Sequence, residues 1–128
     1  MRARYAFAGP DEELVRTVPL EDGEPVLLHG GMRLRALALP RPVVLRLTPR
    51  RLSALLHYAL RPDRVVELPR GAVTAVDLVR GAVRITWRGD DGEHVLRLTS
   101  GGGRVLLARA LDADAVADAL HAWLAPRD

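Results

Sequence analysis

The sequence of 128 residues contains no cysteine, lysine, asparagine or glutamine. Without cysteine the chain can form neither a disulfide framework nor a thiolate metal site, and it has no cysteine nucleophile. All nineteen basic residues are therefore arginine, which a GC-rich genome explains without selection for function. The longest stretch without a charged residue, Leu52 to Leu60, is far shorter than the roughly 20 residues that a membrane-spanning helix needs.

The amino-terminal residues begin basic but become acidic at Asp11, and they include no apolar region of signal-peptide length. With 48% hydrophobic and 27% charged residues, the composition is that of an ordinary globular protein, which excludes disordered, collagen-like and coiled-coil classes. The length suits one domain. We therefore expect a soluble protein that is cytoplasmic, or peripheral at a membrane surface, and has no transmembrane segment.

Charge is distributed unevenly along the chain, although the formal net charge is only +3. Residues 1–31 carry three arginines against six acids, residues 32–109 carry fifteen against six, and residues 110–128 carry one against four. No acid occurs between Pro25 and Pro62, a stretch that contains seven arginines. Either the acidic ends neutralise the basic middle in the fold, or one basic face stays open to an anionic partner.

Alternating hydrophobicity predicts several short strands. Within 83–88, the residues Val83, Ile85 and Trp87 share one face. The sequence from Gly89 to Gly92 predicts a hairpin turn, because glycine and aspartate tolerate the positive φ that such turns require. Short strands with turn residues between them are typical of an antiparallel barrel or sandwich. Further runs of strand-forming residues cover 43–47, 64–68, 72–79, 94–99 and 104–107.

The carboxy-terminal residues predict an amphipathic helix. Asp112 lies at the expected N-cap, and Asp114 in the first turn suits the helix dipole. Leu111 and Val116 occupy the positions of a hydrophobic staple, and Pro126 ends the helix. A single apolar stripe is formed by Val116, Leu120, Trp123 and Leu124.

The segment from Thr48 to Leu60 fits two structures. Thr48 as N-cap and Pro49 at the first helical position, followed by apolar residues at helical spacing, favour a helix. Alternate residues from Leu52 onward would also place one apolar face on a strand. Local propensity favours the helix, and only the neighbouring elements can reverse that preference.

The order of elements, strands followed by one helix that carries a tryptophan, resembles the pleckstrin-homology-like (PH-like) superfold, particularly bacterial PH-like and GRAM-type domains. The sequence at 47–52 is similar to the L-T-x-x-R-L turn of that family, and 64–69 and 72–76 resemble two of its strands. Trp123 is similar to the tryptophan with which the family's terminal helix plugs one opening of the barrel. The resemblance covers residues 24–124, and the ordered set carries it rather than any single motif.

The resemblance implies a mainly β fold, namely a PH-like antiparallel β-barrel of about seven strands capped by one C-terminal α-helix. The PH-like domain would comprise residues 24–128, after an N-terminal extension at 1–23 with a short acidic helix from Pro10 to Arg16. Residues 48–60 would then form a strand, in spite of their local helix propensity.

The sequence offers no catalytic constellation, so we expect a protein that is not an enzyme and needs no cofactor or metal. It contains no G-x-S-x-G motif. Asp90 and Asp91, which lie between glycines, are interpreted as turn residues. The run 101–103 of glycines lacks the lysine of a P-loop and is interpreted as a flexible connection. The histidines lack zinc-site spacing and are interpreted as surface or core residues: His29, His57, His94 and His121.

Ligand-binding PH domains hold phosphoinositide head groups with basic residues around their first two strands, and arginine suits bidentate phosphate contacts. The family's lipid-binding signature also needs a basic-x-Arg pair on the second strand, where Arg46 stands alone. We therefore favour a solvated arginine face. Trp87 and Tyr58 lie on apolar faces, so they are predicted core residues and nucleic acid is not an expected partner. The anion- or lipid-binding set that the resemblance implies is Arg33, Arg35, Arg46, Arg50 and Arg51.

These observations predict a non-catalytic PH-like binding module, an adaptor that uses strand edges or a groove to bind a protein partner or a second copy of itself. The alternative is a module that binds anionic phospholipid head groups through its arginines. A third and more distant interpretation is a small non-catalytic subunit of an enzyme complex, which would follow if residues 48–60 were helical.

Overall fold

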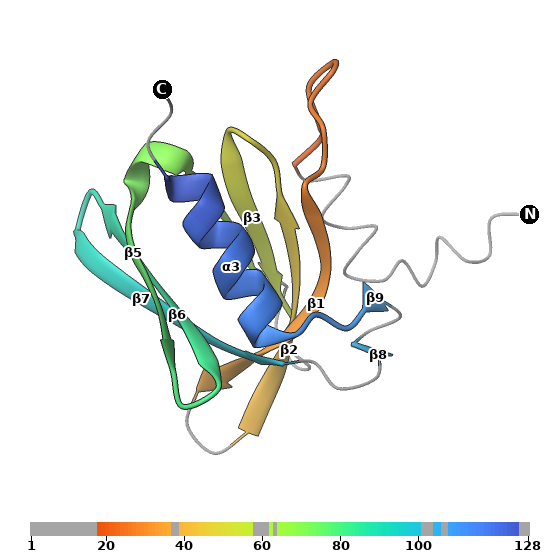
Figure 1. Ribbon diagram of the computed structural model, residues 1–128, viewed down its shortest axis with the longest axis vertical. Coiled ribbons are helices and arrows are strands. Elements are labelled where there is room, and N and C mark those ends of the chain that lie inside the picture. Colours follow the sequence, from red (N-terminus) through yellow and green to blue (C-terminus); the bar gives the residue numbers. More distant parts are fainter. Residues whose placement is uncertain are drawn as a thin grey trace, which may run out of the picture.

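The structure, a computed structural model, describes residues 18–36, 39–57, 62, 64–100, 104–105 and 108–125. Within these ranges, seven strands form one antiparallel sheet in the order β4-β3-β2-β1-β7-β6-β5, and one α-helix follows them (Figure 1). The predicted mainly β fold with a C-terminal helix is confirmed. The elements are β1 (Leu28–Ala36), β2 (Leu39–Leu47), β3 (Arg51–Leu56), β4 (Arg64–Pro69), the 3-10 turn η1 (Arg70–Ala72), β5 (Val73–Val79), β6 (Ala82–Gly89), β7 (Gly92–Ser100), a separate ribbon of β8 (Arg104–Val105) and β9 (Ala108–Arg109), and α3 (Ala113–Leu124).

The sheet is strongly curled around α3 (Figure 1). It is not closed into the barrel that the sequence predicts, because β4 and β5 each pair with one neighbour among the described strands and form the two edges. η1 joins these edges and leads the chain from one half of the sheet to the other. The helix packs against β5, β6, β7 and β1, so helix packing rather than β4–β5 pairing covers the concave face.

Within the segment that fits both a helix and a strand, 48–50 lie in a turn and residues 51–56 form β3, the strand that the resemblance implies. It hydrogen-bonds to β2 on one side and to β4 on the other. Leu52, Ala54 and Leu56 face the main core, and Leu55 is buried on the opposite face. As a strand, these residues pair their backbone N–H and C=O groups with β2 and β4 and bury both of their faces. These gains override the local helix propensity. Residues 58–60 lie outside the described residues.

The main core lies between the concave face of the sheet and α3. Val83 and Ile85 are completely buried, as their alternation predicts, and Trp87 is partly buried against the same core. Full burial of a large aliphatic side chain contributes about 1.5–3 kcal/mol. The predicted helix stripe is confirmed by burial of Val116, Leu120 and Trp123, with Leu111 and Leu124 packed beside them.

Among the described residues, no helix is long and apolar enough to cross a membrane.

The start of α3 is fixed to the end of β7. Asp112 is the N-cap, as predicted, but its own side chain makes no capping hydrogen bond. Instead the hydroxyl of Ser100 accepts the backbone N–H of Ala113 at 2.8 Å and donates to the Asp112 carboxylate at 3.2 Å. The unpaired N–H at the helix start is therefore satisfied by a residue from the sheet.

The end of α3 is fixed to two turns. The guanidinium of Arg70 in η1 donates to the carbonyl oxygens of Trp123 and Ala125, at 2.7 and 2.9 Å. The indole N–H of Trp123 donates to the carbonyl of Pro49, in the β2–β3 turn, at 3.2 Å. The two bonds from Arg70 satisfy carbonyl groups that the helix end leaves without a partner, and together with the bond from Trp123 they set the position of the helix across the sheet.

Two tight hairpins join β5, β6 and β7. Arg80 and Gly81 both have positive φ, 52° and 78°, as a type I′ turn requires. The predicted turn between β6 and β7 is confirmed, but its positive φ lies at Gly92 rather than at Asp90 or Asp91.

Some expectations fall on other parts of the chain. The predicted helix from Pro10 to Arg16 and the glycine run at 101–103 lie outside the described residues. Of the run at 104–107, the structure describes β8, which pairs with β9 and is not part of the seven-stranded sheet.

The chain that leads into α3 crosses β1 at close range. Gly31 forms an isolated parallel bridge with Ala110, and its carbonyl accepts the N–H of Leu111 at 2.8 Å. A Cβ atom on Gly30 would lie 2.5 Å from the carbonyl oxygen of Arg109 and 2.6 Å from Cγ of Leu111. The crossing therefore requires glycine at position 30.

We expect Gly30→Ala to lower the free energy of unfolding by about 1–3 kcal/mol, because the added methyl group must displace backbone or a packed leucine. Urea unfolding measures this change. The control Gly71→Ala places its Cβ where no atom lies within 4 Å, and it should change the free energy by less than about 0.5 kcal/mol. Equal effects of the two substitutions would contradict the close crossing.

Candidate functional site

The pairing register places the predicted arginines of the first strands on the convex face of the sheet. Arg33 in β1 and Arg46 in β2 alternate with core residues, and Arg51 in β3 follows the same alternation. Arg35 lies in β1 opposite a proline of β2, but its side chain lies outside the described residues. Arg50 is in the turn before β3. Arg33, Arg46 and Arg51 therefore share a face, yet their surroundings differ.

Arg51 is held by two carboxylates. Its guanidinium donates to the two oxygens of Glu24, at 2.8 and 3.1 Å, and to Glu67 in β4 at 2.6 Å. A further hydrogen bond of 2.9 Å goes to the carbonyl of Pro19. The side chains of Arg51 and Glu24 are only 15% and 3% exposed. We call Arg51, Glu24, Glu67 and Thr48 the arginine clamp.

Thr48 joins the arginine clamp to the β2–β3 turn. Its hydroxyl donates to Glu24 at 2.6 Å and accepts the backbone N–H groups of Arg50 and Arg51 at 3.3 Å. The hydrogen bond from Arg51, followed by that from Thr48, lowers the pKa of Glu24 from 4.5 to about 2. The same contact raises the pKa of Arg51. The clamp therefore fixes the segment before β1 to this turn.

Arg46 is buried within the structure rather than exposed to a ligand. Its residue is 2% exposed, and its guanidinium donates to the carbonyl of Val18. Beside it, Val18, Val44 and Leu55 form a second apolar cluster on the convex face of β2 and β3. Arg46 thus contributes to the contact between this face and the segment that precedes β1.

Arg50 is exposed and forms an ion pair with Glu21. Exposed ion pairs of this kind contribute about 0–1 kcal/mol. Of the predicted set, Arg46 and Arg51 therefore bind partners within the protein. Arg50 forms its ion pair with Glu21 at the surface, and Arg33 lies on β1 beside β7.

We expect Glu24→Gln to destabilise the fold by about 1.5–3 kcal/mol at neutral pH, because the amide cannot replace the charge-assisted bonds to Arg51. The folded-state pKa of Glu24 is depressed, so its contribution is present above pH 4.5 and is lost as the pH falls toward 2. Urea unfolding of wild type and variant over this range measures the difference between them.

The difference should shrink steadily between pH 4.5 and pH 2. The control Glu93→Gln changes an exposed carboxylate in β7 and should alter stability by less than about 0.5 kcal/mol. A difference for Glu24→Gln that is independent of pH would contradict the role of its charge in the arginine clamp.

Among the described strands β5 pairs with β6 alone, so its other side presents an open main-chain edge. Residues in an antiparallel pair alternate between those that hydrogen-bond to the neighbouring strand and those whose N–H and C=O point away. Val79 and Ala82 flank a two-residue turn and form a hydrogen-bonded pair, so Leu78 directs its main-chain groups away from β6. The side chains of Leu78 and Val79 are 45% and 37% exposed.

α3 covers only part of this edge. The Nε2–H of His121 donates to the carbonyl of Val76 at 2.6 Å, which places Val76 in the same outward orientation as Leu78. Val76 is buried, whereas Leu78 lies beyond this contact and is exposed. Leu78 is not among the site residues that the sequence predicts, since an apolar residue before a turn gives no sign that its strand is an edge.

The other histidines lie in separate places. His29 is in β1 and His57 follows β3, and both are half-buried. His94 stacks on Trp87, with ring centroids 5.4 Å apart, and its Nε2 lies 2.6 Å from a carboxylate oxygen of Asp91. This hydrogen bond lowers the pKa of Asp91. Within the described ranges, no three histidine or acidic side chains gather in an arrangement that could hold a metal ion.

Comparison with known proteins supports the fold. No family model and no curated protein matches the chain. The C-terminal domain of an unknown protein from Leishmania infantum is 15% identical in sequence; the match covers 89% of this chain and 97% of that domain, with a TM-score of 0.60. A structure of SsgB, from work on longitudinal cell division during sporulation of Streptomyces coelicolor, is 18% identical with a TM-score of 0.40, over 79% of this chain and 84% of that one. At 15% identity, the likeness to the Leishmania infantum domain concerns the fold alone. The likeness to SsgB is too slight to bear on fold or function.

Proposed function

We propose that this chain is a non-catalytic, PH-like protein-interaction module that takes an extended segment of a partner onto the edge of β5. The observation that carries the proposal is the open main-chain edge at Leu78, beside exposed aliphatic side chains. The PH-like assignment is supported by two antiparallel runs, β1–β4 and β5–β7, followed by a helix on the concave face.

Strand addition matches the chemistry of this edge. An extended peptide gains main-chain hydrogen bonds from unpaired N–H and C=O groups, while its alternate side chains contact the neighbouring residues. Leu78 offers both main-chain groups, and its side chain and that of Val79 offer apolar contacts. The edge is short because His121 already occupies the carbonyl of Val76, so the proposed partner strand begins beyond α3.

β5 suits this role better than β4, the other edge. β4 exposes Arg64 and Glu67, and it ends in the exposed Pro69. Charged residues and proline are the usual means by which edge strands resist pairing. The exposed end of β5 carries two aliphatic residues in succession, Leu78 and Val79, between Asp77 and the β5–β6 turn.

The alternatives have less support. Binding of anionic lipid through the predicted arginine set would have to proceed without Arg46 and Arg51, whose guanidinium groups bind internal partners. The enzyme-subunit interpretation depended on a helix at 48–60, and residues 51–56 form β3.

To test the proposal, a phage library of random linear peptides is selected on the wild-type protein, and binding of the enriched peptides is measured on two variants. We expect Leu78→Lys to weaken binding by at least about tenfold, because it places a strongly hydrated charge on the edge. The control Val95→Lys makes the same kind of change at a residue that is 53% exposed but lies in β7, inside the sheet.

Peptides that bind wild type and Val95→Lys equally well, but lose affinity for Leu78→Lys, would support strand addition at β5. Light scattering over a range of protein concentrations shows whether a second copy can supply the added strand, since the mass would then rise above 14.0 kDa in wild type but not in Leu78→Lys. Equal binding to all three proteins, or a monomer that enriches no peptide, would contradict the proposal.

A further inference from the structure

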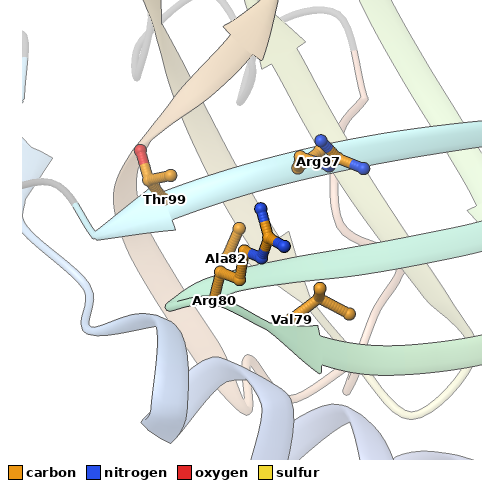
Figure 2. Close-up of a pocket in the computed structure, with 5 residues that line it drawn as sticks. All are labelled: Val79, Arg80, Ala82, Arg97 and Thr99. Carbon is orange, nitrogen blue, oxygen red and sulfur yellow. The ribbon is translucent and has the colours of Figure 1, made fainter.

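A hollow of about 400 Å³ lies on the convex face of the sheet, near the β5–β6 turn. Its walls come from the turn and three strands, and Figure 2 shows the side chains of the two arginines around it. The volume is within the range of small-molecule sites. The hollow exists because small residues from β6 and β7 stand side by side between longer neighbours. The lining residues are Val79, Arg80, Ala82, Arg97 and Thr99.

The hollow is cationic and lacks an acidic lining residue. Within the described part of the chain, neither Arg80 nor Arg97 forms an ion pair or a side-chain hydrogen bond. The nearest carboxylate by register is that of Asp77, which contacts Arg84 at 3.3 Å. Arg84 stands directly opposite Arg97, a pairing of like charges that is unfavourable in a sheet. A bound anion at Arg97 would relieve this repulsion.

Arg80 occupies a position where an arginine is poorly suited to the backbone. Its φ of 52° lies in the left-handed region, which glycine, asparagine and aspartate adopt far more readily. A type I′ turn would therefore be more stable with one of these residues at position 80. Within the described part of the chain the Arg80 side chain forms no hydrogen bond in the turn, and it lines the hollow instead.

We propose that this hollow binds a phosphate monoester through Arg80, Arg97 and Thr99. Two guanidinium groups balance the charge of about −1.5 to −2 that a phosphate monoester carries at neutral pH, whereas a carboxylate or a phosphodiester supplies only one charge. Each guanidinium can give paired N–H donors to phosphate oxygens, and the hydroxyl of Thr99, which also lines the hollow, is a further donor. Its present acceptor, the carbonyl of Arg33, lies at 3.4 Å, the length of a weak bond.

This site differs from the one that the sequence predicts. It lies on β5, β6 and β7 rather than around the first two strands, and it uses none of Arg46, Arg50 and Arg51. Arg33, which pairs with Thr99 across β1 and β7, is the member of the predicted set that borders it. The site shares Val79 with the edge of β5 but does not include Leu78, so the variants that test phosphate binding leave intact the residue on which the test of strand addition depends.

A phosphate monoester occurs both on soluble metabolites and on the lipid phosphatidic acid, and two probes distinguish these sources. Calorimetry measures binding of glycerol 3-phosphate. Co-sedimentation measures binding to phosphatidylcholine vesicles that contain phosphatidic acid, with phosphatidylglycerol, a phosphodiester, as the control lipid. We expect binding of at least one monoester probe, and preference for phosphatidic acid over phosphatidylglycerol if the lipid is bound.

Three variants assign any binding to the hollow. Arg80→Asn and Arg97→Thr should each weaken binding at least about tenfold, because each removes charge-assisted hydrogen bonds. Arg80→Asn should at the same time raise the melting temperature by about 2–5 °C, since asparagine suits a positive φ. The control Arg88→Ala removes the same charge from an exposed site on β6, six residues or about 20 Å along the strand from Ala82, and should leave binding unchanged.

Loss of binding in Arg80→Asn and Arg97→Thr, with retention in Arg88→Ala, would support the site for whichever probe is bound. If Arg80→Asn gains thermal stability as expected, its loss of binding does not come from unfolding. No binding of either monoester, equal binding by all variants, or an equal loss in Arg88→Ala would overturn the proposal.

Discussion

The contact between Arg51 and Glu24 neutralises positive charge of the sheet and fixes the acidic segment before β1 to it. Glu24 lies just before the long acid-free stretch, and the fold brings it back to that stretch to bind Arg51 by two hydrogen bonds. Glu67 completes the neutralisation from β4. The same contact holds the segment before β1 against the β2–β3 turn, and the buried Arg46 reinforces it through the carbonyl of Val18. In this half of the sheet, positive charge stabilises the fold.

In the other half of the sheet, β5–β7, some arginines have no acidic partner among the described residues. Arg80 and Arg97 line a hollow without forming an ion pair in the described part of the chain, and the exposed aliphatic edge of β5 lies next to it. Of the two outcomes that the charge distribution allows, neutralisation by the acidic amino-terminal segment occurs at Arg50 and Arg51, which pair with Glu21 and Glu24. The hollow and the edge of β5 both lie on the half of the sheet for which the sequence predicts no site residue.

Local patterns predicted the elements but not the contacts between them. The alternation at 83–88 and the stripe of α3 were predictable because each of these elements buries one face. β3 was ambiguous because both of its faces are buried, and only its neighbours make it a strand. Glu24 lies 27 residues from its partner Arg51, and Ser100 lies 13 residues from Ala113 at the helix start, so spacing could not reveal these contacts. The open edge depends on strand order, which the sequence of β5 does not contain.

Strand addition at β5 requires that Leu78 directs unpaired main-chain groups to solvent. Residue-resolved amide hydrogen exchange along β5, at low protein concentration, tests it directly. Because N–H groups alternate in direction, Asp77 and Val79 should be protected by β6, while Leu78 should exchange faster than both. Protection of Leu78 equal to that of its two neighbours would mean that the edge is covered, and it would contradict the account.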